Sequence, residues 1–317
     1  MPVSLFSLEV EDLGKEVPRG LPLIITMLGA SDSGGVVGGL DRYIWDNCDP
    51  RVVLRFKPDL LLDYRSRRPL MKFEGNRFTA YEPDELVLAL ATDELGAQFL
   101  VLSGFEPDYR WERFTEVVLL LIRELDVSVT SWVQALPMPV PHTRPLVKTI
   151  SGTKPELIEE FSDWNPDTRL SASIVHLLEF QLTNLNKPVV GCTLSLPHYL
   201  SSTEYPDGLL AAISVLSSIT GLIFATEELL ERSQRFNQQV DRQVAENDEH
   251  REMVISLEQR FDALQHEKEN SGLSPILGEG ESIPSADEIA DEFEQYLAAA
   301  ISDEGGADPD TGDDQAF

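Results

Sequence analysis

The chain has 317 residues, 42% of them hydrophobic, which is enough for a sizeable core and excludes a disulfide-stabilised miniprotein or a wholly disordered chain. Its 55 acidic and 25 basic residues give a formal net charge of −30, and this charge repels nucleic-acid phosphates and anionic lipid headgroups. No apolar run approaches the roughly 20 residues that cross a bilayer, so we expect neither nucleic-acid nor membrane partners.

The two cysteines, Cys48 and Cys192, have neither the spacing of a metal motif nor the pattern of a disulfide framework. The first residues lack the basic start and the long apolar core of a secretion signal. Together these features predict a reducing, cytoplasmic environment.

Residues 1–225 alternate β-branched and aliphatic runs with helical patterns, which is typical of an α/β sheet covered by helices. The expected strands are 21–28, 52–62, 86–91, 99–102, 127–133 and 189–196. The expected helices are 36–47, 111–125, 173–185 and 207–219. Residues 70–81, with Glu74-Gly75-Asn76 at their centre, predict a β-hairpin that is added to the main sheet.

Residues 227–267 contain no Pro or Gly and are rich in Glu, Gln, Arg and Asp, so they predict a helical extension over 226–270. Apolar residues recur in steps of three and four, but Gln243, Asn247 and His250 interrupt the pattern. We therefore expect two helices or one kinked helix, packed on the body or on a second subunit. A long coiled coil is the alternative.

Residues 271–317 form the third segment, with thirteen Asp or Glu and no Lys or Arg. The segment is rich in Ser, Gly and Pro and has one apolar cluster at helical spacing, formed by Ile289, Phe293, Tyr296 and Leu297. We predict a disordered acidic tail with one short amphipathic helix, which either only keeps the chain soluble or docks on a partner.

A glycine-rich turn, Gly29-Ala30-Ser31-Asp32-Ser33-Gly34-Gly35, follows an expected strand and opens an expected helix. That context suits a phosphate-binding loop. However, the Lys and Ser or Thr of a P-loop are absent, and neither G-x-G-x-x-G nor G-x-S-x-G is complete. The turn therefore either serves helix packing or holds an anion or polar ligand at the helix N-terminus.

The segment Asp63-Tyr64-Arg65-Ser66-Arg67-Arg68-Pro69 places three guanidiniums within four positions of a strongly acidic chain. Such groups must pair with carboxylates or bind an anionic group. The carboxylates considered as partners are Asp63, Glu106 and Asp108, and the alternative is an interface or a ligand site.

Residues 104–112 lie between an expected strand and an expected helix. We expect Asp108 to be the N-cap of that helix and Glu112 to lie in its first turn, which explains both acids without a catalytic role.

Two loops place a Pro-His pair after a strand, Pro141-His142 and Pro197-His198. The carboxyl ends of parallel strands are where α/β proteins usually keep their sites, and the prolines fix His142, Arg144 and His198 in one geometry. No serine or cysteine is placed as a nucleophile, and no histidine spacing suggests a metal. The loops are therefore structural, ligand-binding or partner-binding.

Five blocks resemble the actinobacterial branch of the proteasome assembly chaperone family, second-chaperone type. They are Gly29-x-x-Asp32-Ser33-Gly34, Asp63-Tyr64-Arg65-x-Arg67-Arg68-Pro69, Gly104-x-Glu106-Pro107-Asp108-x-Arg110-Trp111, Pro137-Met138-x-x-Pro141-His142-Thr143-Arg144-Pro145 and Pro197-His198-Tyr199. The match covers about residues 20–265. It implies a three-layer α/β/α core similar to the purine nucleoside phosphorylase fold, a helical C-terminal extension, and self-association, with a trimer as one candidate size. Eukaryotic relatives escort proteasome α subunits, and the family has no agreed catalytic residues.

Two classes of function follow. The favoured one is a non-enzymatic binding or assembly protein with an unidentified protein client and no cofactor or metal. Its binding candidates are Gly29, Asp32, Ser33, Gly34, Asp63, Arg65, Arg67, Arg68, Glu106, Asp108, Arg110, Arg144 and Tyr199. The alternative is an enzyme acting on a small anionic substrate, nucleoside- or phosphate-ester-like, with catalytic candidates His142, His198 and Asp32. An enzyme predicts one deep concavity surrounded by Asp32, Arg65, His142, Arg144 and His198.

Overall fold

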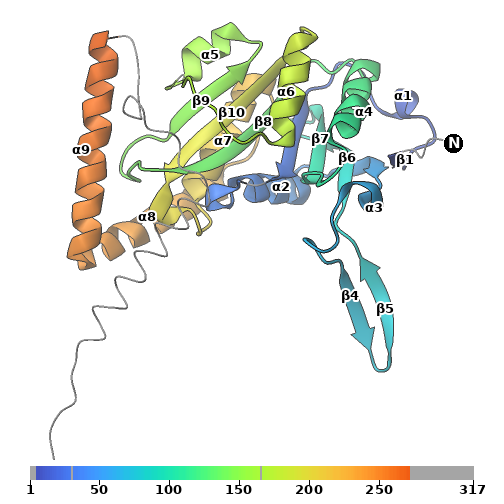
Figure 1. Cartoon of the computed structure of the whole chain (residues 1–317), viewed down its shortest axis with the longest axis horizontal. Helices are drawn as coiled ribbons and strands as arrows, with labels where there is room; N and C mark the ends of the chain where they lie inside the picture. Colours follow the sequence, from blue (N-terminus) through green and yellow to red (C-terminus); the bar gives the residue numbers. More distant parts are fainter. Residues whose placement is uncertain (1–4, 30, 165, 272–317) are drawn as a thin grey trace, which may run out of the picture. The chain divides into compact units, whose positions relative to one another are not determined.

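The computed structural model describes residues 5–29, 31–164 and 166–271. Its main feature is an eight-stranded mixed sheet with strand order β1-β3-β6-β7-β2-β8-β10-β9 (Figure 1). The four central strands are parallel and comprise β7 (Gln98–Phe105), β2 (Leu23–Leu28), β8 (Thr130–Met138) and β10 (Val189–Pro197). The flanking strands pair antiparallel and comprise β1 (Phe6–Leu8), β3 (Arg51–Phe56), β6 (Leu86–Thr92) and β9 (Val147–Gly152).

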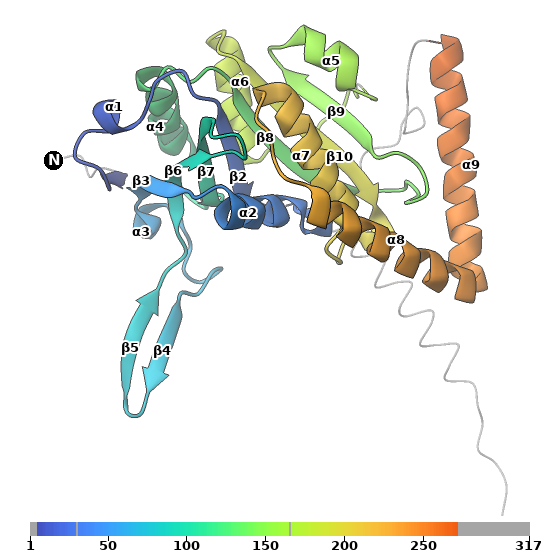
Figure 2. The same cartoon turned by 180° about the vertical axis from the view of Figure 1, so that it is seen from behind.

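Helices cover both faces of this sheet (Figures 1 and 2). Successive residues of a strand point to opposite faces. Ile24 of β2 accordingly packs in a core with α2 (Val36–Asn47) and α7 (Pro206–Thr220), and its neighbour Ile25 packs in another with α4 (Trp111–Glu124) and α6 (Ile174–Asn184). The architecture is the expected three-layer α/β/α core.

One expected strand is too long, and several short elements, β1 and β9 among them, are not expected from the sequence. The strand expected over 52–62 ends at Phe56, because Pro58 has no amide donor and opens the short helix α3 (Pro58–Leu61). Strand β9 and helix α5 (Pro155–Phe161) have only partly buried patterns, so neither produces a clear apolar run. A short helix α1 (Leu13–Glu16) follows β1.

The hairpin is present but does not join the main sheet. Strands β4 (Leu70–Glu74) and β5 (Arg77–Glu82) form a separate two-stranded sheet, with Gly75 at a positive φ of 63° in the turn. The next strand, β6, already pairs with β3 on one side and β7 on the other, which leaves no edge for the hairpin. The hairpin therefore extends away from the sheet (Figures 1 and 2).

The helical extension consists of two helices, α8 (Glu227–Glu246) and α9 (Asp248–Ser271). They are separated at Asn247, where the backbone is extended, and this confirms the break that the sequence predicts. Among the described helices, none combines the length and apolar character needed to cross a bilayer. The predicted tail, with its cluster around Phe293, lies outside the described residues, and the domain boundaries at 225 and 270 stay predictions.

Candidate functional site

The glycine-rich turn forms the start of α2 through a short 3-10 turn, η1 (Ser33–Gly35). The Asp32 carboxylate accepts hydrogen bonds from the amides of Val37 at 2.7 Å and Gly38 at 3.0 Å. The chain thus places its own anion at this helix N-terminus, where a bound phosphate would lie. A Cβ on Gly34 would come within 2.9 Å of Leu196, so this glycine serves close packing. Ser33 is buried beside it.

Gly29 and Glu106 lie side by side, because β2 and β7 are parallel neighbours. A Cβ on Gly29 would approach the Glu106 Oε2 to 2.9 Å. The Glu106 side chain is buried, and its Oε1 accepts a 2.5 Å hydrogen bond from the Ile174 amide at the start of α6. The carboxylate thus satisfies one of the donors that a helix N-terminus leaves open, which is a structural task.

The arginine segment is fixed to the loop before α4 by Asp108. Its Oδ2 accepts hydrogen bonds from the Asp63 amide at 2.7 Å and from Arg67 Nη1 at 2.6 Å. The Arg67 guanidinium also lies 4.8 Å from the centroid of the Phe105 ring. Arg67 therefore has the carboxylate partner that the sequence predicts.

Asp108 is not the N-cap of α4, contrary to expectation. Arg110 takes that position with a left-handed φ of 62°, and Glu112 lies in the first turn as predicted. The reason is that Asp108 is already engaged by Asp63 and Arg67.

The two Pro-His loops meet because β8 and β10 are parallel neighbours. The Tyr199 hydroxyl accepts a hydrogen bond from the His142 amide at 2.8 Å and lies 2.6 Å from His142 Nδ1. On the other side of the ring, Nε2 lies 3.2 Å from Asp241 Oδ1 of α8. Burial raises the pKa of Tyr199 to about 12, so its phenol stays protonated at neutral pH. The buried His142 ring thus joins the loops to α8.

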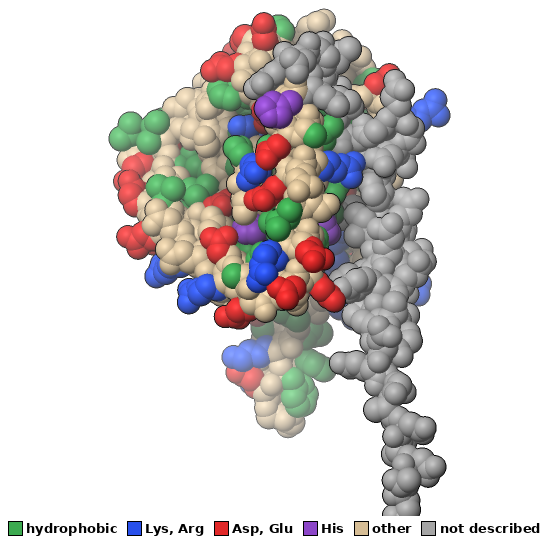
Figure 3. Space-filling view, turned by 90° about the vertical axis from the view of Figure 1, so that its left-hand side faces the viewer, with side chains coloured by type: hydrophobic (Ala, Val, Ile, Leu, Met, Phe, Trp, Pro, Cys, Tyr) green, Lys and Arg blue, Asp and Glu red, His purple; other side chains and the backbone are tan. Residues whose placement is uncertain are grey.

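Arg144 joins the same loop to α9. Its guanidinium donates to Asp262 through Nε at 2.8 Å and Nη2 at 2.7 Å, and to Glu258 through Nη1 at 3.0 Å. The hydrogen bonds from Arg144 lower the pKa of Asp262, which keeps that carboxylate charged. Figure 3 views the α9 side, where acidic and basic side chains are interspersed on the exposed surface. His198, in η2 (His198–Leu200), is exposed and contacts the Tyr199 ring edge-on.

A groove of about 820 Å³ is lined by residues of α2, the 204–209 segment and α8. Gly39 and Leu209 belong to its lining, together with charged residues from all three segments. Glu204 accepts hydrogen bonds from Arg42 and from Arg232, and these bonds lower the Glu204 pKa. Sequence reasoning missed Arg42, Glu204 and Arg232, because no linear motif links positions so far apart in the chain.

Of the side chains expected around one concavity, His142, Arg144 and His198 belong to the two adjoining Pro-His loops, whereas Asp32 and Arg65 lie in other segments. Asp32 bonds to the amides of α2, Arg144 to α9, and His142 to Tyr199 and α8. None of the five expected residues lines the 820 Å³ groove. In the part of the chain that the structure describes, no group of three or more His, Cys, Asp or Glu is arranged to hold a metal ion.

The family model described as the PAC2 family matches residues 26–244. A Mycobacterium tuberculosis protein of unknown function is similar in structure, with 34% identity and a TM-score of 0.77 over 86% of this chain and 94% of that chain. A protein of unknown function from Corynebacterium glutamicum is similar too, with 30% identity and a TM-score of 0.77 over 83% of this chain and 98% of that chain.

A Mycobacterium tuberculosis proteasome-assembly chaperone homologue shares the fold, with 17% identity and a TM-score of 0.67 over 74% of this chain and 100% of that chain. No protein with a curated description matches the chain. The family model spans more than half of the sequence, and the first Mycobacterium structure is 34% identical over 86% of it. This chain belongs to the PAC2 family.

Proposed function

We propose that this protein is a non-enzymatic, chaperone-like binding protein that self-associates and acts on a protein client. The proposal rests on what the polar side chains at the carboxyl ends of the parallel strands bond to. Asp32, Glu106, His142 and Arg144 bond to the chain itself, and none of them lines the groove. They build a rigid scaffold.

Rigidity of this kind suits recognition, because a loop that is ordered before binding loses little entropy on contact. The Pro-rich loop 136–145 is held at Tyr199, α8 and α9, and the arginine segment is held at Asp108. The fold shared with a proteasome-assembly chaperone homologue supports the same class of function.

Self-association is supported by the β4–β5 hairpin. Its side chains are largely exposed, including Leu70 at 71%, Phe73 at 59% and Phe78 at 63%. The Phe73 and Phe78 rings pack against each other with centroids 5.1 Å apart. A lone two-stranded hairpin is marginal in water, and exposed apolar surface marks contact sites. We assign self-association to this hairpin, with a trimer as one candidate size.

The cytoplasm is the proposed compartment. Cys48 and Cys192 are buried free thiols. Burial raises the pKa of Cys48 to about 11 and that of Cys192 to about 12, so both stay protonated and unreactive, as a reducing compartment allows.

The groove favours a second candidate function. Its 820 Å³ volume lies within the range of about 300–1,000 Å³ for small-molecule sites, and it contains the polar groups of Arg42, Tyr43 and Arg232. An enzyme or binding protein for a small polar molecule would use these residues, of which Arg42 and Arg232 pair with Glu204.

Affinity purification of the full chain from native cells, followed by mass spectrometry, tests the client. A matched sample carrying Tyr43→Phe and Arg42→Gln, two changes in the groove, serves as control. The proposal expects the same protein partners in both samples. A small molecule that copurifies with the wild type but not with the groove variant, with no reproducible protein partner in either sample, would favour the second candidate.

A further inference from the structure

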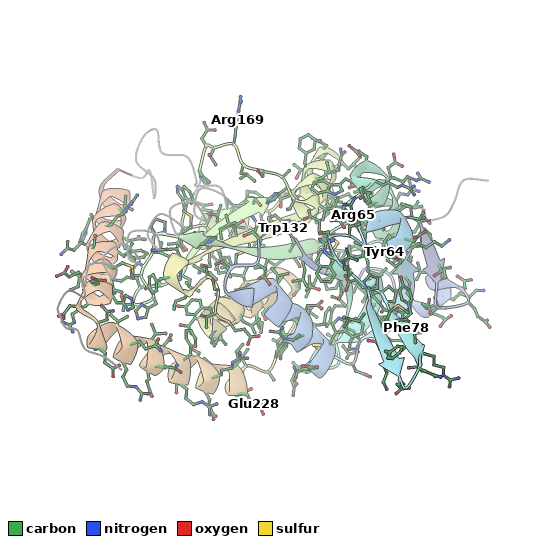
Figure 4. The ribbon with its side chains drawn as sticks, turned by 60° about the horizontal axis from the view of Figure 1, so that its bottom comes forward. Tyr64, Arg65, Phe78, Trp132, Arg169 and Glu228 are labelled. Atoms are coloured by element: carbon green, nitrogen blue, oxygen red, sulfur yellow. The ribbon has the colours of Figure 1, made fainter. Side chains whose placement is uncertain are left out.

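Five residues at the base of the hairpin form a surface called here the Arg–Tyr patch: Tyr64, Arg65, Arg68, Tyr109 and Arg110. The two segments that carry them are held together, because the Asp108 and Tyr109 amides both donate to the Leu61 carbonyl. The Tyr64 side chain also hydrogen-bonds Tyr81 of β5. The patch therefore adjoins the hairpin, and Figure 4 shows Tyr64 and Arg65 on that side of the molecule.

The arginines of the Arg–Tyr patch lack ionic partners. Among the described residues, Arg65, Arg68 and Arg110 have no carboxylate within 4.0 Å, whereas Arg67 between them pairs with Asp108. All three side chains are exposed. Arginine and tyrosine are enriched among the residues that contribute most to protein contacts, and a guanidinium binds a carboxylate through two parallel hydrogen bonds. The patch therefore suits an acidic protein surface.

The groove between α2 and α8 offers such a surface. Its lining contains five carboxylates and three arginines, and two of these arginines, Arg42 and Arg232, pair with Glu204. In the part of the chain that the structure describes, the other four acids of the lining have no Lys or Arg within 4.0 Å, and all four are exposed: Asp46, Glu227, Glu228 and Glu231. The groove thus carries unpaired negative charge, and the patch carries unpaired positive charge.

The patch and the groove lie on different parts of one compact unit, and Figure 4 shows Arg65 well apart from Glu228. A single copy of the chain therefore does not join them. Contact between two different surfaces of identical chains is heterologous, and copies related by a closing rotation form a ring. The trimer named above as a candidate size would be such a ring.

We propose that the Arg–Tyr patch of one copy binds the groove between α2 and α8 of the next copy. Arg65 and Arg68 pair there with the carboxylates of Asp46, Glu228 and Glu231. The inference rests on the self-association proposed above and names the surface that receives the hairpin side of the neighbour. Opposite charges on the two surfaces set the orientation in which the copies meet. The hairpin, beside the patch, adds its exposed apolar side chains to the same contact.

Charge reversal on each side tests the contact. The patch variant carries Arg65→Glu and Arg68→Glu, and it leaves Arg67 with its partner Asp108. The groove variant carries Asp46→Lys and Glu231→Lys. Asp46 lies in the last turn of α2 and Glu231 lies beyond the first turn of α8, so lysine at these positions does not oppose the helix dipoles.

Light scattering at micromolar concentration should give the mass of one chain for each variant alone, because like charges then face each other. An equimolar mixture should regain a larger mass, since the reversed patch fits the reversed groove and the unchanged patch fits the unchanged groove. Matched reversals elsewhere, Arg19→Glu with Arg242→Glu and Glu159→Lys with Glu160→Lys, change exposed residues outside both surfaces and should keep the mass of the wild type.

Cross-linking gives a second measurement that does not depend on charge reversal. The variant Arg68→Cys with Glu231→Cys keeps Arg65, Asp46 and Glu228, and the native cysteines are buried. A bismaleimide should link its copies to one another, whereas either single cysteine variant should stay as separate chains.

The outcomes separate this inference from the self-association on which it rests. An oligomeric wild type whose mass survives both reversals would overturn the inference and leave self-association standing. Loss of mass that the mixture does not restore, or no link in the double cysteine variant, would also overturn it. A wild type with the mass of one chain would refute self-association and the inference together.

Discussion

Arg144 and Asp262 are paired by two hydrogen bonds, Nε to Oδ1 at 2.8 Å and Nη2 to Oδ2 at 2.7 Å, across 118 positions of sequence. This pair fixes α9 to the Pro-rich loop after β8, and Glu258 adds a third hydrogen bond at 3.0 Å. The geometry is bidentate, the strongest form of such a pair. The C-terminal helices are therefore attached to the carboxyl edge of the sheet by polar contacts.

Changing Arg144 to Ala should release α9 while leaving the sheet intact. Amides of 248–266 should exchange with deuterium faster, because the loop then no longer holds Asp262 and keeps only the Thr143 hydrogen bond to Glu258. Arg113→Ala is the control, since Arg113 pairs with Glu116 inside α4, away from α9. Unchanged exchange in Arg144→Ala would show that apolar packing alone holds the helix.

Changing Glu106 to Ala should lower the free energy of unfolding by about 1–3 kcal/mol, because the Ile174 amide loses its buried acceptor. Glu106→Gln keeps an acceptor oxygen and should cost less. Urea unfolding measures both, with the exposed Glu112→Ala as reference. A loss in Glu106→Ala no larger than that in Glu112→Ala contradicts the assigned role.

The half-buried Glu179 gives a prediction on pH. Burial raises its pKa above 4.5, against the hydrogen bonds from Ser151 and Trp132, which lower it. The folded state thus binds this proton more tightly than the unfolded state, and the contribution of Glu179 to stability falls as pH rises from the unfolded to the folded pKa. Above the folded pKa, the partly desolvated charge is a constant cost.

Glu179→Gln should therefore be more stable than the wild type at about pH 8, and this advantage should shrink towards about pH 4. Burial also raises the pKa of Asp41, which gives the same pH dependence of stability in both proteins. The difference in stability between the two proteins therefore isolates Glu179. Urea unfolding across that range measures it. A stability difference that does not vary with pH would refute the assignment.

The double change Phe73→Ser and Phe78→Ser should lower the mass of the protein measured by light scattering at micromolar concentration. Both side chains are mostly exposed, so the melting temperature should change little. Leu95→Ser removes an equally exposed apolar side chain, 76% exposed, outside the hairpin and should leave the mass unchanged. A monomer mass for the wild type would refute self-association itself.

Local patterns in the sequence predict local structure well. Residues 36–47 form α2 with the predicted bounds, because a glycine-rich start and an apolar stripe both mark them. The pairing of Arg67 with Asp108 also follows from composition, since an acidic chain offers its arginines many carboxylates.

Contacts between distant segments are what the sequence does not predict. Arg144 stands out in its loop, but nothing in the sequence selects Asp262 as its partner. The hairpin is predicted from Glu74-Gly75-Asn76, yet its separation from the sheet depends on β3 and β7 occupying both edges of β6. The groove likewise depends on three segments that meet only in the fold.

We propose that Asp32, Glu106, His142 and Arg144, at the carboxyl ends of the parallel strands, form a scaffold for contact and perform no chemistry. A screen of nucleosides, phosphate esters and short peptides with the full chain, His142→Ala and His198→Ala tests it most directly. We expect no turnover in any of the three proteins. Turnover by the full chain that disappears in either histidine variant would contradict it.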